Sequence, residues 1–505
     1  MEQQPTTLPD ELRLVSPATL PQARSYVFPI PSVDQTYDIK NSSQPIQIDI
    51  PRLQRSYLSK DSYLSFTVSV TWQPGDNGGA SSALDGPKIA AFLETPGAFG
   101  LFDSIEVYDY LGSTLLERTN GHAELMSLLV DGNPTGYGPS YATGTRNYGV
   151  CYPSNPPYYG SDPTVSGPFS GTVFPSDKVA SGAPVQTVTV SRDFSIPLAS
   201  FLGFMSKKMA PLHNGYTILL KWNSYLSAFG ATDLLAVGFG TPTAFDAVSV
   251  SNVKYNAQIL ELGPLAESML QMSTNGDPMM IHTKSYRNYT TIWPAGGTYV
   301  ERTLDLNLNV ASMTGLLWQM REDTKINKLA NRNFQRIRNH LVNWSFVYGS
   351  SVLPNSSGID TKSTEAASFA SGTQGYQELM KALRAQDKLT NFSLDSWNVD
   401  SSTTSDSTTL CCPFLDITHG TDVLNQMAIG RFACGLNTQL TPGYDSISGL
   451  NTNGISTQIK ARFSYNANKQ TWPGTTNIVQ ANVDAWVEYD AFITVIPGIS
   501  TSVTF

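Results

Sequence analysis

The sequence has few of the residues that cross-link a secreted protein or anchor one in a membrane. Only 4 of its 505 residues are cysteines, and two of them, Cys411 and Cys412, are adjacent. Four cysteines are too few to cross-link a fold of this size through disulfide bonds. We therefore expect free thiols and a reducing compartment. No stretch of about 18 apolar residues could span a bilayer. Residues 1–22 lack the basic segment and apolar core of a secretory signal.

Charged side chains are also scarce, at 14% of the chain, against about 25% in an average soluble domain. The formal net charge is -9, and no run of Lys or Arg exceeds two residues. Phosphate contacts need a concentrated basic surface, so the sequence does not favour direct coating of a genome or sequence-specific nucleic-acid binding. Polar loops rich in Ser, Thr, Asn and Gly, or a surface that faces other protein, would each explain the low charge.

The familiar motifs of catalysis and metal binding are missing as well. The chain has no G-x-x-x-x-G-K-[ST] phosphate loop, no H-E-x-x-H, no paired C-x-x-C and no G-x-S-x-G. Asp76 and Asp416 are isolated loop carboxylates, which are expected to be solvated. The histidines have no ligand spacing and are expected to be satisfied surface residues: His122, His213, His282, His340 and His419. We therefore predict no catalytic residue, no cofactor and no metal site, and a protein that is not an enzyme.

What the sequence does contain is turns and alternating strands. Its 39 Gly and 31 Pro residues are scattered between short apolar stretches, which is typical of an all-β protein. Ile46, Ile48 and Ile50 alternate with polar neighbours, and residues 301–310 alternate most clearly of all. Period-2 alternation places one face of a strand on a core. The fold class is therefore predicted to be all-β.

Shifts in pattern divide the chain into segments. The expected order is an extended N-terminal arm at 1–40, a first β-sandwich at 41–264, a linker at 265–280 and a second β-sandwich at 281–505. Long surface loops are expected at 131–188, 350–375 and 393–410. The first loop mixes Gly and Pro with many Tyr residues, and because disordered segments are poor in aromatics, we expect it to be ordered.

An internal repeat links the two halves. Three anchors recur in the same order: 253–259 with 487–493, 124–126 with 378–380, and Gly112 with Gly349. Any one match could arise by chance among β-strands. Three in order, including a helical segment that interrupts strands, favour a duplicated domain over a solenoid of short repeats.

Two tandem sandwiches, with a helix after the middle strands and long surface loops, resemble a known family. It is the double jelly-roll major capsid proteins of tailless icosahedral DNA viruses. The family includes proteins of virophages, polinton-like viruses, giant viruses, membrane-containing phages and, more distantly, the adenovirus hexon. The segments that carry the resemblance are 102–117, 196–222, 304–321 and 432–456. Leu316-Leu317-Trp318 fits an apolar pair and Trp of the family, although the Pro common just before it is absent. The resemblance implies two eight-stranded jelly rolls with short helices.

The resemblance also implies a function. Three chains would form a homotrimeric capsomer with a nearly hexagonal footprint, which tiles an icosahedral shell around a double-stranded DNA genome. The implied partners are neighbouring capsomers, minor capsid or penton proteins, and an internal membrane or a membrane-associated protein. The protein would be made in the host cytoplasm or nucleus and reside in the virion.

Other classes of function stay open at this point. A viral spike, a minor capsid protein or a carbohydrate-binding β-sandwich could use the Tyr-rich loop, with Tyr158 and Tyr159 stacking on sugars. A polysaccharide hydrolase would need two carboxylates about 5–10 Å apart, and the sequence offers no convincing pair.

Overall fold

The computed structural model describes most of the chain from residue 23 to residue 505. The stretches outside the described residues are 1–22, 42–43, 73–88, 94–95, 111, 132–172, 176–187, 207, 234–244, 274–277, 324–325, 328–332, 335, 362–372, 385–396, 398–431, 442–446 and 465–477.

The first half folds into two facing antiparallel sheets. One sheet has the order β1-β14-β5-β10 and the other has the order β3-β12-β7-β8. Their bounds are β1 Ala23–Pro31, β3 Ile46–Ile50, β5 Tyr63–Trp72, β7 Phe102–Asp109, β8 Leu115–Asn120, β10 Val188–Ile196, β12 Tyr216–Trp222 and β14 Ala247–Leu262. Short strands β2 (Thr36–Asp38), β4 (Ser56–Leu58) and β11 (Ala210–Pro211) extend the first sheet.

The second half repeats this arrangement. One sheet has the order β15-β23-β17-β21 and the other has the order β16-β22-β18-β19. Their bounds are β15 Met279–Trp293, β16 Tyr299–Asp305, β17 Met313–Glu322, β18 Leu341–Tyr348, β19 Ser351–Leu353, β21 Cys434–Asn437, β22 Thr457–Ser464 and β23 Ala481–Ile496. Strand β20 (Ile359–Asp360) pairs with β18, and β24 (Ser500–Thr504) pairs with β23.

Both halves therefore share one strand order. Counting the eight principal strands in chain order, one sheet reads first-eighth-third-sixth and the other second-seventh-fourth-fifth in each half. A helix lies between the fifth and sixth strands both times, α1 (His122–Asp131) and α4 (Thr373–Ala382). The turns between the fourth and fifth strands contain Gly112 (φ 70) and Gly349 (φ 56), where only glycine is relaxed. The predicted duplication, and with it the all-β tandem jelly-roll fold, is confirmed.

Alternating side chains build the two cores. Ile46, Ile48 and Ile50 of β3 are each 0% exposed and face the opposite sheet. The prediction for 301–310 is correct in its burial and wrong in its length. β16 ends at Asp305, because the next backbone groups bond outside the sheet ladder: Thr452 Oγ1 accepts the Val310 N–H at 3.1 Å. Leu306, Leu308 and Val310 nevertheless stay buried.

Several predicted boundaries need correction. Residues 1–40 were expected to form an arm, but β1 and β2 lie within them, and β1 pairs with β14 over all nine of its residues. The sequence does not show this, because "ARSYVFPIP" has weak alternation and two prolines. The loop expected at 350–375 contains β19 and β20, and α4 begins at Thr373. Helix α3 (Pro264–Ser273) needs no such correction, because the sequence of the linker segment predicts a short helix there.

The other long loops fall largely beyond the described residues. Of 131–188, the structure describes Asp131, strand β9 (Val173–Pro175) and Val188, and of 393–410 it describes only Trp397. β9 joins β6 (Ile89–Leu93) and β13 (Phe229–Asp233) in a small third sheet. Along the chain, the short helix η2 (Gly97–Leu101) follows β6, and the short helix α2 (Tyr225–Ala228) directly precedes β13.

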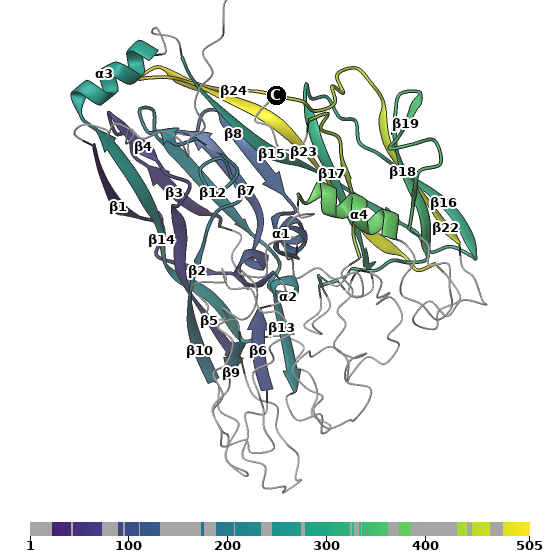
Figure 1. Ribbon diagram of the computed structural model, residues 1–505. Coiled ribbons are helices and arrows are strands. Elements are labelled where there is room, and N and C mark those ends of the chain that lie inside the picture. The colour runs from purple at the N-terminus through teal and green to yellow at the C-terminus, as the bar shows by residue number, and fades with distance from the viewer. Residues whose placement is uncertain are drawn as a thin grey trace, which may run out of the picture.

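The two sandwiches stand side by side (Figure 1). β1 lies at one lateral end of the molecule, and the sheet of β16, β22, β18 and β19 lies at the other. Helix α3 and the C-terminus lie at the end opposite the small sheet of β6, β9 and β13. In the part of the chain that the structure describes, no helix is long and apolar enough to cross a membrane.

Candidate functional site: the junction between the two sandwiches

The described residues bring together two histidine–carboxylate pairs. His213 Nε2 lies 3.3 Å from Glu267 Oε1, and His282 Nε2 lies 3.0 Å from Asp490 Oδ1. In both pairs the carboxylate is already engaged, because the Tyr57 hydroxyl donates to Glu267 at 3.0 Å. Asp490 likewise accepts a hydroxyl bond. No group of three or more His, Cys, Asp or Glu side chains among the described residues could hold a metal ion.

The histidines themselves are not where the sequence analysis placed them. His122 is 0% exposed and His340 is 5% exposed, so the expectation of surface residues is wrong for them. His122 begins α1 and packs against Phe99, and burial lowers its pKa to about 4. His419, Asp76 and Asp416 lie outside the described residues, as do Tyr158 and Tyr159. A single sequence does not reveal the burial of a lone histidine, because burial depends on what packs over it.

The most elaborate polar arrangement lies where the two sandwiches meet. β15 pairs with β23 along one edge. Along its other edge Thr283 forms an isolated bridge with Ser206 of the first sandwich, and β8 lies against β15. The first sandwich therefore covers the free edge of the first strand of the second. An uncovered strand edge would present unpaired N–H and C=O groups to other chains.

Apolar side chains cross this junction in both directions. Leu125 and Leu128 of α1 are 0% exposed and belong to the core of the second sandwich. Ile281, Ile493 and Val495 of the second sandwich belong to the core of the first. Buried apolar area contributes about 25 cal/mol per Å², so separating the sandwiches would expose these side chains to water and cost free energy.

Glu117 of β8 is a buried acid at the junction. Its Oε2 accepts the Phe201 N–H at 2.8 Å, and its Oε1 accepts the Ser285 hydroxyl of the second sandwich at 3.1 Å. Burial raises the pKa of Glu117 to about 7, although these two hydrogen bonds oppose the rise. The carboxyl group therefore keeps its proton to a higher pH than an exposed glutamate does.

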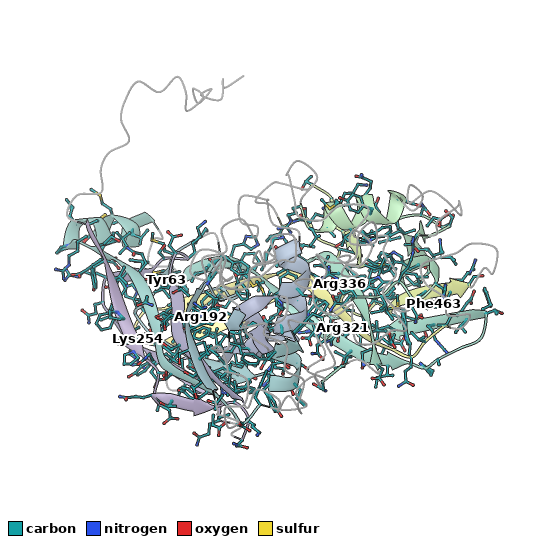
Figure 2. The ribbon with its side chains drawn as sticks, turned by 90° about the horizontal axis from the view of Figure 1, so that it is seen from below. Tyr63, Arg192, Lys254, Arg321, Arg336 and Phe463 are labelled. Carbon is teal, nitrogen blue, oxygen red and sulfur yellow. The ribbon has the colours of Figure 1, made fainter. Side chains whose placement is uncertain are left out.

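Arg321 forms the main ion-pair centre of the junction. One of its nitrogens lies 3.1 Å from Glu124 of α1 and 3.0 Å from Asp484 of β23. Burial raises the pKa of Glu124, while the Arg321 charge acts to lower it. Arg336, also buried, donates to the Ser127 carbonyl of α1 at 3.0 Å. Figure 2 labels both arginines beside α1. Removing one partner of such a buried pair leaves an uncompensated charge.

Asn214 connects the two sandwiches by hydrogen bonds at the opposite end of the junction. Its amide nitrogen donates to the carbonyls of Ile496 and Ser500 at 3.0 and 2.8 Å, and its Oδ1 accepts the Gly498 N–H at 2.7 Å. These groups form the turn between β23 and β24, so a residue of the first sandwich holds the last turn of the second.

Sequence reasoning missed every polar residue of the junction. Glu117, Asn214 and Arg321 lie in segments whose sequence shows only strand or loop character. The one available signal was the repeat, because it placed α1 and α4 at equivalent positions and so suggested that α1 has a structural role.

Solved structures of viral proteins are similar to this chain over its whole length. A chain in the structure of the Sputnik virophage matches with a TM-score of 0.57 at 12% identity, over 100% of this chain and 92% of that one. The mavirus major capsid protein matches with a TM-score of 0.53 at 12% identity, over 100% and 95%. This chain has the double jelly-roll fold. A chain of the PBCV-1 virus capsid also matches this double jelly roll, with a TM-score of 0.50 at 11% identity, over 98% and 99%. By sequence, no protein-family model and no curated protein matches the chain.

Proposed function

We propose that this chain is the major capsid protein of an icosahedral, double-stranded DNA virus. The observation that carries the proposal is the strand order that the two halves share. The likeness of the whole chain to the mavirus major capsid protein, and of 98% of it to a PBCV-1 capsid chain, supports it. Two matched sandwiches fixed side by side suit a tiling unit, since they give one chain two similar lateral walls.

Three chains would form the capsomer. Six sandwiches then give a nearly hexagonal footprint, which packs into a shell with neighbouring capsomers and with minor capsid or penton proteins. A charged content of 14% suits broad lateral contacts, because each buried unpaired charge costs several kcal/mol. The two domains of each unit would be 23–262 and 279–504, joined at α3.

The proposal is tested by the mass and shape of the purified protein. Light scattering after size exclusion should give about 165 kDa, three times the 54.9 kDa of one chain. Negative-stain images should show three-lobed particles with a hexagonal base. A stable monomer at high micromolar concentration, with no lattice under crowding conditions, would contradict the proposal.

A further inference from the structure

A lysine and two carboxylates lie together where the first and eighth strands of the second sandwich pair. Lys284 of β15 stands directly opposite Asp490 of β23 in the antiparallel register. Side chains that lie opposite each other share one face of a sheet, and Glu488, two positions along β23, lies on the same face. Lys284 Nζ lies 3.8 Å from Asp490 Oδ1 and 3.6 Å from Glu488 Oε2. We call these three side chains the Lys284 cluster.

Water has little access to the Lys284 cluster. The side chains of Lys284, Glu488 and Asp490 are 16%, 11% and 2% exposed. Both distances from Lys284 Nζ exceed that of a hydrogen bond, so the amine lies beside two acids and is hydrogen-bonded to neither. Removing an ammonium group from water favours its neutral form. Burial accordingly lowers the pKa of Lys284, and the nearby charge of Arg384 adds to this effect, against the opposing charges of the two carboxylates.

The Asp490 carboxyl group is held from two sides. The Ser312 hydroxyl donates to its Oδ2 at 2.6 Å, and His282 Nε2 lies 3.0 Å from its Oδ1. His282 is itself stacked on Phe492, with the ring centroids 5.3 Å apart. These contacts fix the orientation of the carboxyl group, with Oδ1 on the side of the lysine and Oδ2 on the side of the serine.

Glu488 is positioned beside the lysine by hydrogen bonds from three other side chains. Arg384 donates to its Oε2 at 2.6 Å, and the Thr314 hydroxyl donates to the same oxygen at 2.8 Å. The Tyr286 hydroxyl donates to Oε1 at 3.4 Å. A carboxylate fixed next to an amine can accept and return a proton while that amine reacts. Glu488 is therefore placed to carry a proton for Lys284.

An amine, a carboxyl group and a second carboxylate that are buried together have the chemistry to form an amide. We propose that Lys284 and Asp490 condense to an intramolecular isopeptide bond, with Glu488 as the proton carrier. The bond joins β15 to β23, the first and eighth strands of the second sandwich, so these strands cannot separate. It forms within a single chain. The inference therefore goes beyond the proposed function and does not depend on it.

The reaction balances without a co-reactant. A proton first passes from the Lys284 ammonium group to Asp490 Oδ1, which leaves a neutral amine and a neutral carboxyl group. The lone pair of Nζ attacks Asp490 Cγ and forms the Nζ–Cγ bond, while the Ser312 hydroxyl stabilises the charge that develops on Oδ2. Glu488 takes a proton from Nζ and delivers it to Oδ1, the Cγ–Oδ1 bond breaks, and Oδ1 leaves as water. The lysine and aspartate charges are both lost, and Glu488 ends as it began.

The first sandwich has no lysine at the equivalent position. The repeat that aligns 253–259 with 487–493 puts Asn256 in the place of Asp490. The residue opposite Asn256 on β1 is Pro29, whose side chain has no amine. No isopeptide bond can form between these two residues. This position of the first sandwich therefore serves as a control within the same chain.

Lys221 and Glu106 provide a second internal control. Their N···O distance of 2.6 Å is shorter than either distance from Lys284 Nζ, but the Lys221 side chain is 47% exposed. Water stabilises the charges of an exposed ion pair, so we expect no condensation there. Burial of the lysine, and not its proximity to an acid, distinguishes the Lys284 cluster from this pair.

Mass spectrometry of the intact, purified full-length chain tests the proposal. The mass of the folded protein should be lower than that of its sequence by one water molecule. After denaturation and digestion with trypsin, one branched peptide should join the segments that carry Lys284 and Asp490. The peptides that carry Lys221 and Glu106 should stay separate. A protein that keeps its full mass after several days of incubation in the folded state would overturn the proposal.

Variants assign the roles of the lysine and of the glutamate. Lys284→Arg keeps the positive charge but has no amine that can condense, so it should keep its full mass. Glu488→Gln should also keep its full mass, because an amide cannot carry the proton. The matched control is Lys254→Arg, at the position of Glu488 in the first sandwich, and it should lose one water molecule as wild type does. Circular dichroism melting checks that each variant is folded, and the wild-type mass decides on the bond itself if one is not.

The migration of the denatured chain gives an independent measurement. The bond closes a covalent loop from residue 284 to residue 490, which makes the unfolded chain more compact. Wild type should therefore migrate faster than Lys284→Arg on a denaturing gel, and equal migration would contradict the loop. A water loss that persists in Lys284→Arg would refute the assignment of the lysine. Condensation in Glu488→Gln at the wild-type rate would refute the role of the glutamate.

Discussion

Replacing Glu117 with Gln should remove the part of the pH dependence of the unfolding free energy that comes from the Glu117 carboxyl group. The folded pKa of Glu117 is raised to about 7 from an ordinary value of 4.5. Its contribution to stability is therefore fully present below pH 4.5 and is lost as the pH rises to about 7. At about 1.4 kcal/mol per unit, this shift corresponds to a loss of about 3 kcal/mol above that pH. Glu117→Gln keeps the size of the side chain and one acceptor oxygen for the Phe201 N–H, and its NH2 group can donate to the Ser285 hydroxyl oxygen, but the side chain cannot ionise.

The measurement is the free energy or temperature of unfolding of both proteins between pH 4.5 and 8.5. The unfolding free energy of the variant should rise relative to that of wild type by about 3 kcal/mol between the two ends of this range. Most of the change should be complete by pH 7.5. A difference that stays constant with pH would refute the assignment of a buried, neutral Glu117. Other titrating groups cancel in the comparison, since only residue 117 differs.

Glu106 of the adjacent strand β7 is a matched control of opposite sign. Burial raises the pKa of Glu106, but hydrogen bonds from Lys221, Tyr108 and Arg118 outweigh burial and hold it below its ordinary value. Its contribution is present at neutral pH and is lost as the pH falls below about 4.5. Glu106→Gln should therefore destabilise the protein at pH 7 and have less effect in acid.

Two further substitutions test the junction. Arg321→Met should lower the unfolding free energy by about 3–5 kcal/mol, because Glu124 and Asp484 would stay buried without their partner. Adding Glu124→Gln and Asp484→Asn should recover much of this loss, as measured by thermal melting. No recovery would contradict the ion-pair explanation. Asn214→Ala should lower the unfolding free energy by about 2–4 kcal/mol through lost hydrogen bonds. Amide hydrogen exchange should become faster at the β23–β24 turn. Unchanged protection there would contradict the role of Asn214 in holding this turn.

The parts of the fold that the sequence predicted are those that depend on local pattern. Alternation at 46–50 marked a strand, because a pleated strand in a sandwich has one buried face and no other residue needs to be known. Gly112 and Gly349 marked equivalent turns, since both require positive φ. Helical spacing of Leu125, Leu128 and Leu129 indicated α1, and the repeat then pointed to α4. Each of these signals lies within about ten residues of chain.

The parts that the sequence did not predict depend on partners far along the chain. β1 was missed because its nine residues become a strand only through β14, more than 200 positions later. The burial of His122 was missed because Phe99 and its neighbours cover it from another segment. The roles of Glu117 and Arg321 follow from residues of the opposite sandwich.

By itself, then, the amino-acid sequence determined an all-β chain made of two related halves, because periodicity and turn residues act over short distances and survive without knowledge of the third dimension. Only the tertiary structure decided how the halves face each other and which strand edge is covered. Such choices depend on burial and on charge pairs between distant residues, as when Arg321 of the second sandwich pairs with Glu124 of the first.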